Sequence, residues 1–562
     1  MIALVLSSAL AAGPSDVDPV EQALASELKR NVAELTLPGA PPIYHLRYEA
    51  VILTQTDVRA SWGELMHEEH DPYHALGLQL RVGDPMFDNS GFGGWQNGFG
   101  MTWLPRTLTS ESVQQDAWRL TDRSYKQAIE QYARKQAQFT PPDDYPGDYL
   151  LTGPVVHDGG DGGGDPSGLP ATAKAISAAL ALDPSIDIGD VYIGQESGHR
   201  LILDTEGSRV VEPMEECTMR AVVTTRAVDG QLLTDQRLWT VRRPEQLPAL
   251  DVLVADAKAM AEHLLAVAKA PLLDDEYVGP VLFEDGAAID LFRWLLVPQL
   301  EGTPPDVPFD SWFGELGGSG GNVRVGRRVL PSGWSVTDDP SARPDHPASF
   351  ASDNEGTPAQ SVSLVTDGIV RTLLMSRVPR PELSGSNGHA RGSLGQRDMG
   401  KAAIVEIAPA KQSKPAAVRK AALKAAAAYG RDWYVTVRRL QDPAIRGLAG
   451  DTSGYGDEVG SSIPQPVSIV KVFADGHEEE LRGAAFSGVH RWVLRDIIAA
   501  GKTVGGSFMA VPDDGSPVGL GATGGLATYL STPEVLIGEM EIVPTPGDPR
   551  DLPVILPPKM ER

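Results

Sequence analysis

The sequence contains a single cysteine, Cys217, among its 562 residues. A disulfide bond within the chain is therefore impossible, and so is a cysteine-rich zinc site. Cys217 itself is expected to be a small buried apolar side chain.

Long apolar runs are also missing from the body of the chain. The most apolar long window, residues 281–300, contains four charged residues, Glu284, Asp285, Asp290 and Arg293. A membrane-spanning helix needs about 18 or more consecutive apolar residues. We therefore expect no membrane span.

Positive charge is scarce, because 49 Lys and Arg residues face 75 Asp and Glu residues and leave a net charge of −26. A field of this sign repels nucleic-acid phosphates and anionic lipid headgroups. We therefore expect neither of them as a partner.

The first 13 residues are apolar and uncharged, and Ala9-Leu10-Ala11 fits a small-x-small cleavage pattern. This stretch resembles a short secretory signal peptide, but it lacks the basic residues that usually precede the apolar part. We expect a periplasmic or secreted protein, with a cytoplasmic location as the alternative.

Strand-like and helix-like patterns alternate along the rest of the chain. Apolar residues at every second position predict strands, and apolar residues three or four apart predict helices. The predicted strands include residues 43–57, 76–84, 191–193, 200–203, 219–223, 335–337, 361–376, 433–438 and 466–474, and the predicted helices include 14–35, 110–139, 170–182, 251–270, 415–429 and 489–500. The pattern indicates an α+β fold in which each of two domains has a mixed or antiparallel sheet and packed helices.

The predicted domain boundary lies near residues 271–279, directly after the helix predicted to end at residue 270. We expect an N-terminal domain over residues 14–275 and a C-terminal domain over residues 276–562. The N-terminal domain contains a stretch of Gly and Asp at 157–168, HDGGDGGGDPSG, that we interpret as a flexible insertion. A calcium loop is the alternative, but no bidentate Glu follows at the EF-hand position.

Three short segments of the C-terminal half carry the strongest sequence signal. They are the acidic turn Asp353-Asn354-Glu355-Gly356-Thr357-Pro358, the turn Thr366-Asp367-Gly368 and the small-residue loop 384–392, SGSNGHARG. Their order resembles the TldD/PmbA family, whose members act as paired subunits of a zinc peptidase on unfolded peptides. The resemblance covers most of the chain from about residue 190 onward.

Zinc-bearing members of that family have an HExxxH motif and a cysteine ligand near the C-terminus. The corresponding stretch here begins at Phe283, continues with Glu284 and places Ala288 at the second histidine position. A phenyl ring and a methyl group have no electron pair for zinc. The resemblance therefore implies the non-metal partner subunit, PmbA (TldE), and no zinc cofactor is expected.

The same resemblance suggests where a substrate would bind. We name Asp353, Glu355, Asn387, His389 and Arg391 as substrate-binding candidates, because loops of small residues allow close backbone approach. Structural turns are the alternative role for these residues. Glu284, at the position of the family glutamate, is either a leftover general base or a carboxylate at a helix start.

The only histidine cluster is His67, His70 and His74. These residues would share one face of a helix, but Pro72 would break that helix. We interpret the segment as a solvated polar loop and keep a metal site as the alternative.

The sequence therefore predicts a peptide-binding or structural subunit of a peptidase-type dimer, inactive by itself. Its expected partners are an extended peptide and either a second copy of the chain or a zinc-bearing paralogue. The alternatives are an active metallopeptidase with unusual ligands, such as His67, His70 or the acids at 338–355, and an exported stand-alone binding protein.

Overall fold

The computed structural model describes residues 18–93, 97–306, 324–383, 385–442, 445, 462–510 and 525–545. Two large sheets and helices packed against them make up this part of the chain. The α+β class predicted from the sequence is confirmed. The signal-like residues 1–13 lie outside the described residues. Among the described residues, no helix is both long and apolar enough to cross a membrane.

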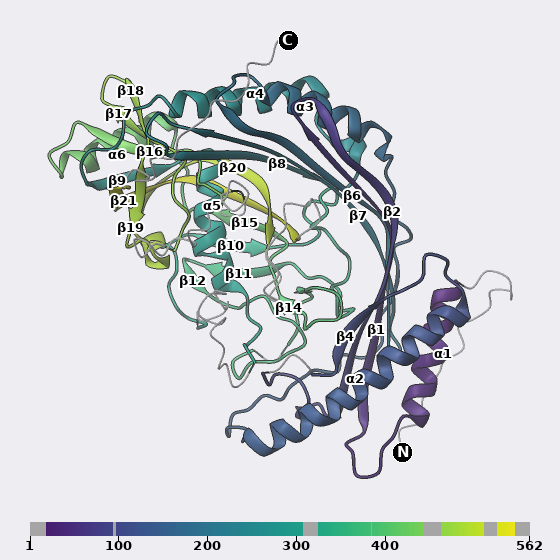
Figure 1. Cartoon of the computed structure of the whole chain (residues 1–562). Coiled ribbons are helices and arrows are strands. Elements are labelled where there is room, and N and C mark those ends of the chain that lie inside the picture. The colour runs from purple at the N-terminus through teal and green to yellow at the C-terminus, as the bar shows by residue number, and fades with distance from the viewer. Residues whose placement is uncertain are drawn as a thin grey trace.

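The N-terminal sheet has eight strands in the order β3-β2-β1-β6-β7-β5, with β4 paired to β2 and β8 paired to β7. Only the pairing of β5 with β7 is parallel. The strands are β1 (Ile43–Ser61), β2 (Glu64–Asp84), β3 (Phe87–Asp88), β4 (Phe99–Trp103), β5 (Val156–Asp158), β6 (Ile186–Asp204), β7 (Arg209–Arg226) and β8 (Leu232–Val241). The longest of these strands bend into an arc around the C-terminal half (Figure 1).

Alternating side chains give this sheet two different faces. Leu46, Tyr48 and Ala50 of β1 belong to an apolar cluster with the helices. The residues that alternate with them, His45, Arg47 and Glu49, are polar. We call the helix-covered side the outer face and the other side, which meets the C-terminal half, the inner face.

Four helices cover the outer face, two toward each end of the arc (Figure 1). Asp18 caps the first helix by accepting a hydrogen bond from Val20 N, and Thr109 and Ser112 form a capping box on the second. The helices are α1 (Pro19–Glu34), α2 (Ser110–Gln138), α3 (Leu169–Leu180) and α4 (Leu250–Val267), with short 3₁₀ turns η1 (Pro166–Gly168) and η2 (Pro244–Gln246).

The C-terminal sheet has eleven strands in the order β12-β11-β10-β15-β21-β9-β16-β17-β18, with β19 and β20 paired to β21. These strands are β9 (Tyr277–Phe283), β10 (Ser335–Asp338), β11 (Val362–Thr366), β12 (Ile369–Val370), β15 (Ile404–Ala408), β16 (Trp433–Val437), β17 (Ile469–Phe473), β18 (Glu478–Leu481), β19 (Ala484–Ser487), β20 (Ile497–Ala510) and β21 (Leu526–Pro544). A separate hairpin pairs β13 (Ala390–Arg391) with β14 (Met399–Gly400). The proposed domain boundary after residue 275 falls in the connection between α4 and β9.

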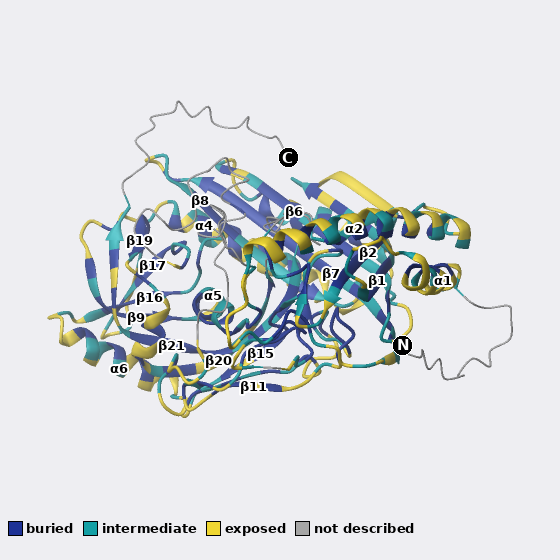
Figure 2. Cartoon of the chain, turned by 90° about the horizontal axis from the view of Figure 1, so that it is seen from below, coloured by how far each residue is buried: buried dark blue, intermediate teal, exposed yellow. Residues whose placement is uncertain are grey.

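Two helices lie on opposite faces of the C-terminal sheet, α5 (Asp285–Leu295) and α6 (Pro415–Ala427). Leu282 of β9 packs with α6, whereas Val281 and Phe283 belong to the larger cluster around α5. Two 3₁₀ turns, η3 (Val297–Leu300) and η5 (Arg491–Asp496), complete this half. Figure 2 shows exposed residues along the outer sides of α2 and α6 and buried residues along the long strands.

Several local predictions were wrong. The segment with His67, His70 and His74 is part of β2, because β1 pairs with it along almost its whole length. Residues 489–500 form η5 and the start of β20, because pairing with β21 overrides the helix-like pattern. The helix predicted over residues 251–270 begins one residue earlier, at Leu250, and ends at Val267.

The Gly/Asp stretch at 157–168 was predicted to be a flexible insertion, but it contains secondary structure and contacts the N-terminal sheet. It contains part of β5, which pairs with β7, and the turn η1. Gly162 N donates a hydrogen bond of 2.7 Å to Gly198 O on β6. A Cβ at Gly162 would lie 2.2 Å from Met214 O, so glycine permits this close approach.

Candidate functional site

The two positions that the sequence analysis aligned with the histidines of the HExxxH motif lie in the hydrophobic core. Phe283, the last residue of β9, and Ala288 in the first turns of α5 are both 0% exposed. The ring of Phe283 stacks on that of Phe486, with centroids 5.8 Å apart and an interplanar angle of 27°. Carbon side chains in a packed core do not fit a zinc ion, since neither residue has a donor atom.

Glu284 follows at the N-terminal cap position of α5, but its side chain makes no capping hydrogen bond. It forms an ion pair with Arg438 (Oε2 to Nε, 3.2 Å), and Arg438 also binds Glu478 (2.9 Å). Burial raises the pKa of Glu284, and Arg438 acts in the opposite direction. The carboxylate is therefore held by a guanidinium.

Asp353 holds the acidic turn together. Its Oδ1 accepts hydrogen bonds from the backbone N–H groups of Glu355 (2.9 Å) and Thr357 (2.8 Å). Its Oδ2 accepts one from Ala390 N (2.9 Å), which ties the turn to the small-residue loop. Asp353 is 1% exposed, so it has the turn-capping role typical of Asp.

Glu355 lies beside Asp353 and is also buried. Its Oε2 accepts a hydrogen bond of 2.5 Å from Arg377 N. Burial raises the pKa of Glu355, and the nearby charges of Asp353 and Asp398 raise it further. The buried turn thus favours the protonated form of Glu355.

The small-residue loop is held by side chain to backbone hydrogen bonds. Asn387 accepts from Met375 N (2.8 Å) and donates to Leu373 O (2.7 Å). His389 Nδ1 lies 2.9 Å from Asn387 O, and Arg391 donates to Ala402 O (2.5 Å) and Ala527 O (2.8 Å).

The structure therefore brings all five substrate-binding candidates into one layer of loops. We call residues 350–358 and 385–402 the loop layer. The side chains of the five candidates make contacts within it or with its supporting strands. Sequence order alone could not show that the acidic turn touches the small-residue loop.

The inner face of the N-terminal sheet is joined to this loop layer by buried polar contacts. Arg47 of β1 forms an ion pair of 2.5 Å with Asp398, and both side chains are at most 2% exposed. Glu212 of β7 accepts a hydrogen bond of 2.7 Å from Ser352 N, and Arg200 of β6 binds Asn354. These contacts fix the distance between the two halves of the chain.

Farther along the inner face, Glu196 of β6 and Glu216 of β7 are directly opposed across the strand pair. Both are half-buried, and Asp57 of β1 lies near them. Burial and the neighbouring carboxylates raise the pKa of Glu196 to about 8, and burial raises that of Glu216 to about 7. This part of the face presents acids without a matching ion pair among the described residues.

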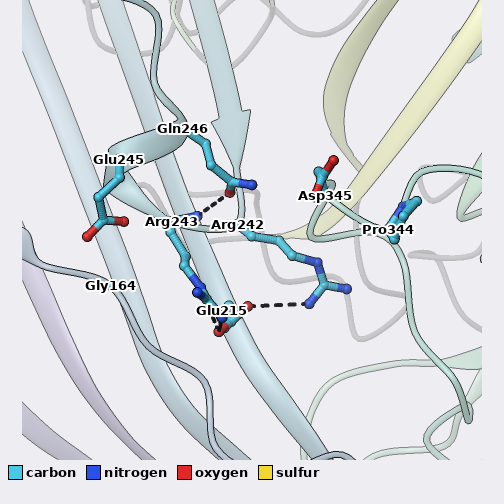
Figure 3. Close-up of a pocket in the computed structure, with 8 residues that line it drawn as sticks. All are labelled: Gly164, Glu215, Arg242, Arg243, Glu245, Gln246, Pro344 and Asp345. Carbon is cyan, nitrogen blue, oxygen red and sulfur yellow. Dashed lines mark hydrogen bonds and ion pairs between the residues drawn. The ribbon is translucent and has the colours of Figure 1, made fainter.

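A pocket of about 520 Å³ opens near the end of β8, between η2 and the loop at Pro344 and Asp345 (Figure 3). Its arginines share one acid, because Glu215 lies 2.7 Å from Arg243 and 3.7 Å from Arg242. Charges at this pocket are mostly paired within the protein. We therefore place the functional region at the inner face and not here.

The three histidines of β2 do not converge. His70 Nδ1 lies 2.8 Å from Thr56 Oγ1, and His74 Nδ1 lies 3.0 Å from Pro105 O. His67 lies on the opposite face, since successive residues of a strand alternate. The metal site considered for this cluster on a helix is therefore wrong.

The acids and arginines of the inner face were missed by the sequence analysis. The available signal was the regular alternation of polar His45, Arg47 and Glu49 with apolar Leu46 and Tyr48. Such alternation with several charges on one side indicates a second polar layer facing the sheet. The partners across the interface, such as Asp398, are more than 300 positions away in the sequence.

Residues 277–424 match the family described as PmbA/TldA metallopeptidase C-terminal domain. This segment therefore belongs to the PmbA/TldD family as its C-terminal domain. The matched segment contains residues 283–288, the acidic turn and the small-residue loop. A search of curated protein sequences finds no match.

Solved structures share the TldD/PmbA-type fold over nearly the whole chain. A proposed modulator of DNA gyrase from Thermotoga maritima is 14% identical, with a TM-score of 0.59 over 93% of this chain and 100% of that one. TldE from Thermococcus kodakarensis is 13% identical, with a TM-score of 0.53 over 94% of this chain and 100% of that one. At these identities the likeness establishes the fold.

Proposed function

We propose that this TldD/PmbA-family chain is a peptide-binding subunit that does not hold the family's zinc ion. The observation that carries the proposal is the burial of Phe283 against Phe486 at the position of the first histidine. Hydrolysis at this position would need a ligand set that the packed core does not provide. The chain would be inactive by itself.

We place the peptide between the loop layer and the inner face of the N-terminal sheet. Polar side chains there remain partly exposed, among them Gln55, Asp57, Glu196 and Glu216. The substrate-binding candidates Asp353, Glu355, Asn387, His389 and Arg391 would act by shaping the loop surface against which the peptide lies. Main-chain groups of an extended peptide would supply much of the affinity.

The free edge of β2 is a weaker place for strand addition. Residues 64–70 are exposed and pair only with β1 among the described strands. The edge carries Glu64, Glu68 and Glu69 and ends near Pro72. Charged residues and proline protect an edge from unspecific pairing.

The proposed assembly is a dimer, either with a second copy or with a zinc-bearing paralogue that performs the hydrolysis. The proposed location is the periplasm or the exterior, as the signal-like residues 1–13 suggest. Native mass spectrometry of the complex from the source cells, together with its metal content, tests both statements. It reports the subunits, the mass of the mature N-terminus and any zinc.

Peptide binding is tested on the purified full chain with a fluorescently labelled peptide that has no stable fold. We expect a rise in anisotropy on binding and no cleavage products by mass spectrometry. Glu196→Arg and Glu216→Arg should change the affinity about tenfold or more, because a charge on the inner face is reversed at close range. Glu130→Arg, on the exposed side of α2, is the matched control and should have no effect.

Two results would contradict the proposal. One is cleavage of the peptide by the chain alone that chelation abolishes. The other is equal peptide affinity in all three charge-reversal variants, each shown to be folded by circular dichroism, because the peptide would then bind away from the inner face.

A further inference from the structure

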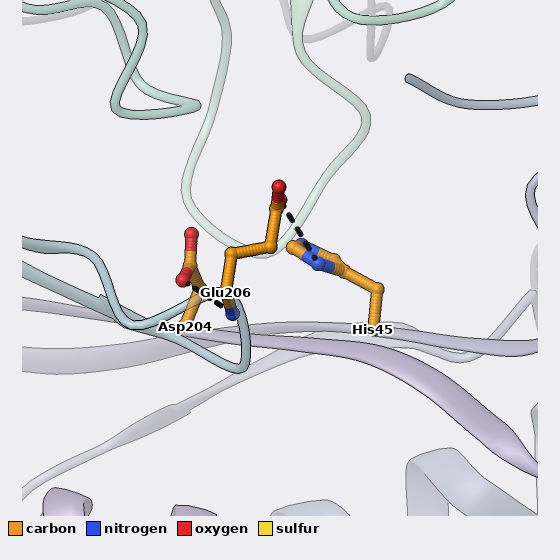
Figure 4. Close-up of side chains that lie close together, drawn as sticks. All are labelled: His45, Asp204 and Glu206. Carbon is orange, nitrogen blue, oxygen red and sulfur yellow. Dashed lines mark hydrogen bonds and ion pairs between the residues drawn. The ribbon is translucent and has the colours of Figure 1, made fainter. Parts of the chain in front are cut away.

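A second group of side chains converges at the far end of the inner face. His45 is near the start of β1, Asp204 is the last residue of β6, and Glu206 lies in the turn to β7. One ligand atom from each lies within 4.8 Å of the others. Within the described part of the chain this is the only such group of three, and Figure 4 shows the side chains pointing toward one another.

Two members of the group carry buried polar atoms without a partner. His45 is 0% exposed and Asp204 2%. The two ring nitrogens of His45 make no hydrogen bond to any described residue, and the same is true of the Oδ2 atom of Asp204. An unsatisfied buried polar atom costs about 1–3 kcal/mol, so three at one place call for a ligand.

The remaining carboxylate oxygens are already oriented by the backbone. Oδ1 of Asp204 accepts hydrogen bonds from Glu206 N (2.8 Å) and Ser208 N (2.9 Å). Oε2 of Glu206 accepts two, from Thr152 N and Gly153 N, both 2.7 Å long. These bonds leave Asp204 Oδ2 without a partner. Glu206 Oε1 lies 3.6 Å from His45 Nδ1 and also accepts a hydrogen bond from Arg377.

The protonation state of the imidazole suits a metal. Burial, followed by the charges of Arg377, Arg81 and Arg47, lowers the pKa of His45 well below its usual value. Neutral imidazole is the form that binds metal ions.

The three arginines that lie near His45 each have a carboxylate partner. Arg81 is paired with Asp88 (2.9 Å), Arg47 with Asp398 (2.5 Å), and Arg377 with Glu206. Glu206 is thus both the partner of Arg377 and one of the three converging side chains.

We propose that His45, Asp204 and Glu206 bind one divalent metal ion, for which Zn²⁺ is the probe. One imidazole and two carboxylates form a nitrogen and oxygen ligand set that zinc accepts. Because the group is buried, the ion would tie β1 to the turn between β6 and β7 and stabilise the inner face. This site is separate from the family's zinc position and does not depend on peptide binding.

The test uses the purified full chain, stripped with EDTA, dialysed, loaded with Zn²⁺ and desalted before elemental analysis. We expect about one zinc per chain and a higher melting temperature with zinc, since a ligand stabilises the state that binds it. Asp204→Asn keeps the oxygen that accepts the two backbone hydrogen bonds but replaces the free one, so it should fold and retain less than a tenth of the zinc. His45→Gln should behave in the same way.

His389→Gln is the matched control, because His389 is also 0% exposed with an unpartnered Nε2 atom but lies outside the group. It should retain the zinc. Wild-type protein without zinc, or equal zinc in wild type and Asp204→Asn, overturns the proposal. Anomalous scattering at the zinc edge from wild-type crystals gives the position of the ion without any variant, and a peak away from these three residues also overturns it.

Discussion

Phe283 stacks on Phe486 with ring centroids 5.8 Å apart, and this contact occupies the position that the sequence analysis assigned to the first histidine of the HExxxH motif. Both rings are 0% exposed and belong to the largest apolar cluster of the C-terminal half. An aromatic pair of this kind contributes to stability beyond its buried area. Position 283 therefore serves the folding of this domain.

Replacing Phe283 with alanine should destabilise the chain by about 3–5 kcal/mol, because a large buried side chain leaves a cavity. Urea unfolding followed by tryptophan fluorescence measures the change. Val228, 101% exposed, provides the control, and Val228→Ala should stay within about 0.5 kcal/mol of wild type. Similar values for the two variants would show that the Phe283 ring is not part of the stable core.

The buried ion pair between Arg47 and Asp398 should be costly to break from one side. Asp398→Ala removes the nearest acid from the buried guanidinium of Arg47 and leaves Glu49 at 3.6 Å. We expect a loss of about 3–5 kcal/mol. The control pair is Asp122 and Lys126 on α2, whose side chains are 40% and 60% exposed. Asp122→Ala should cost less than about 1 kcal/mol, and an equal cost for Asp398→Ala would mean that water reaches Arg47.

The small-residue loop depends on a glycine. Gly388 has φ +71°, and a Cβ there would lie 2.2 Å from Pro358 O. Gly388→Ala should therefore destabilise the chain by about 1–3 kcal/mol. Gly385, in the same loop, has no atom within 4 Å of its Cβ position, so Gly385→Ala should cause no loss. Thermal unfolding of both variants decides whether the backbone of this loop is as strained as the structure indicates.

Stability should fall as the pH rises from about 5 to 9. The pKa of Glu196 is raised to about 8 and that of Glu216 to about 7, both above the ordinary glutamate value of 4.5. The folded state therefore binds more protons than the unfolded state, and this stabilisation, complete below pH 4.5, is lost as the pH passes 7 to 8.

Glu196→Gln should flatten this dependence, because glutamine cannot ionise. Melting temperatures across the pH range measure the effect. Glu68, exposed on β2, is the control, and Glu68→Gln should leave the slope unchanged. A wild-type melting temperature that rises between pH 5 and 9 would contradict the assignment of proton binding to this pair.

Most of the elements could be predicted from local patterns. Residues 110–139 have helical spacing and a polar surface, and the helix was found at Ser110–Gln138. The start of β20 was mistaken for a helix, because residues 497–500 are held as a strand by their pairing with β21. Short segments of mixed character take their structure from such neighbours.

The sequence by itself determined the α+β class, the membership of the C-terminal half in its family and the lack of donor atoms at positions 283 and 288. These features depend on residue identity and on order along the chain. Only the tertiary structure decided that the acidic turn, the small-residue loop and the inner face form one region, and that His45 meets Asp204 and Glu206. Such contacts join residues far apart in the chain, and their positions follow from how the long strands pair and bend.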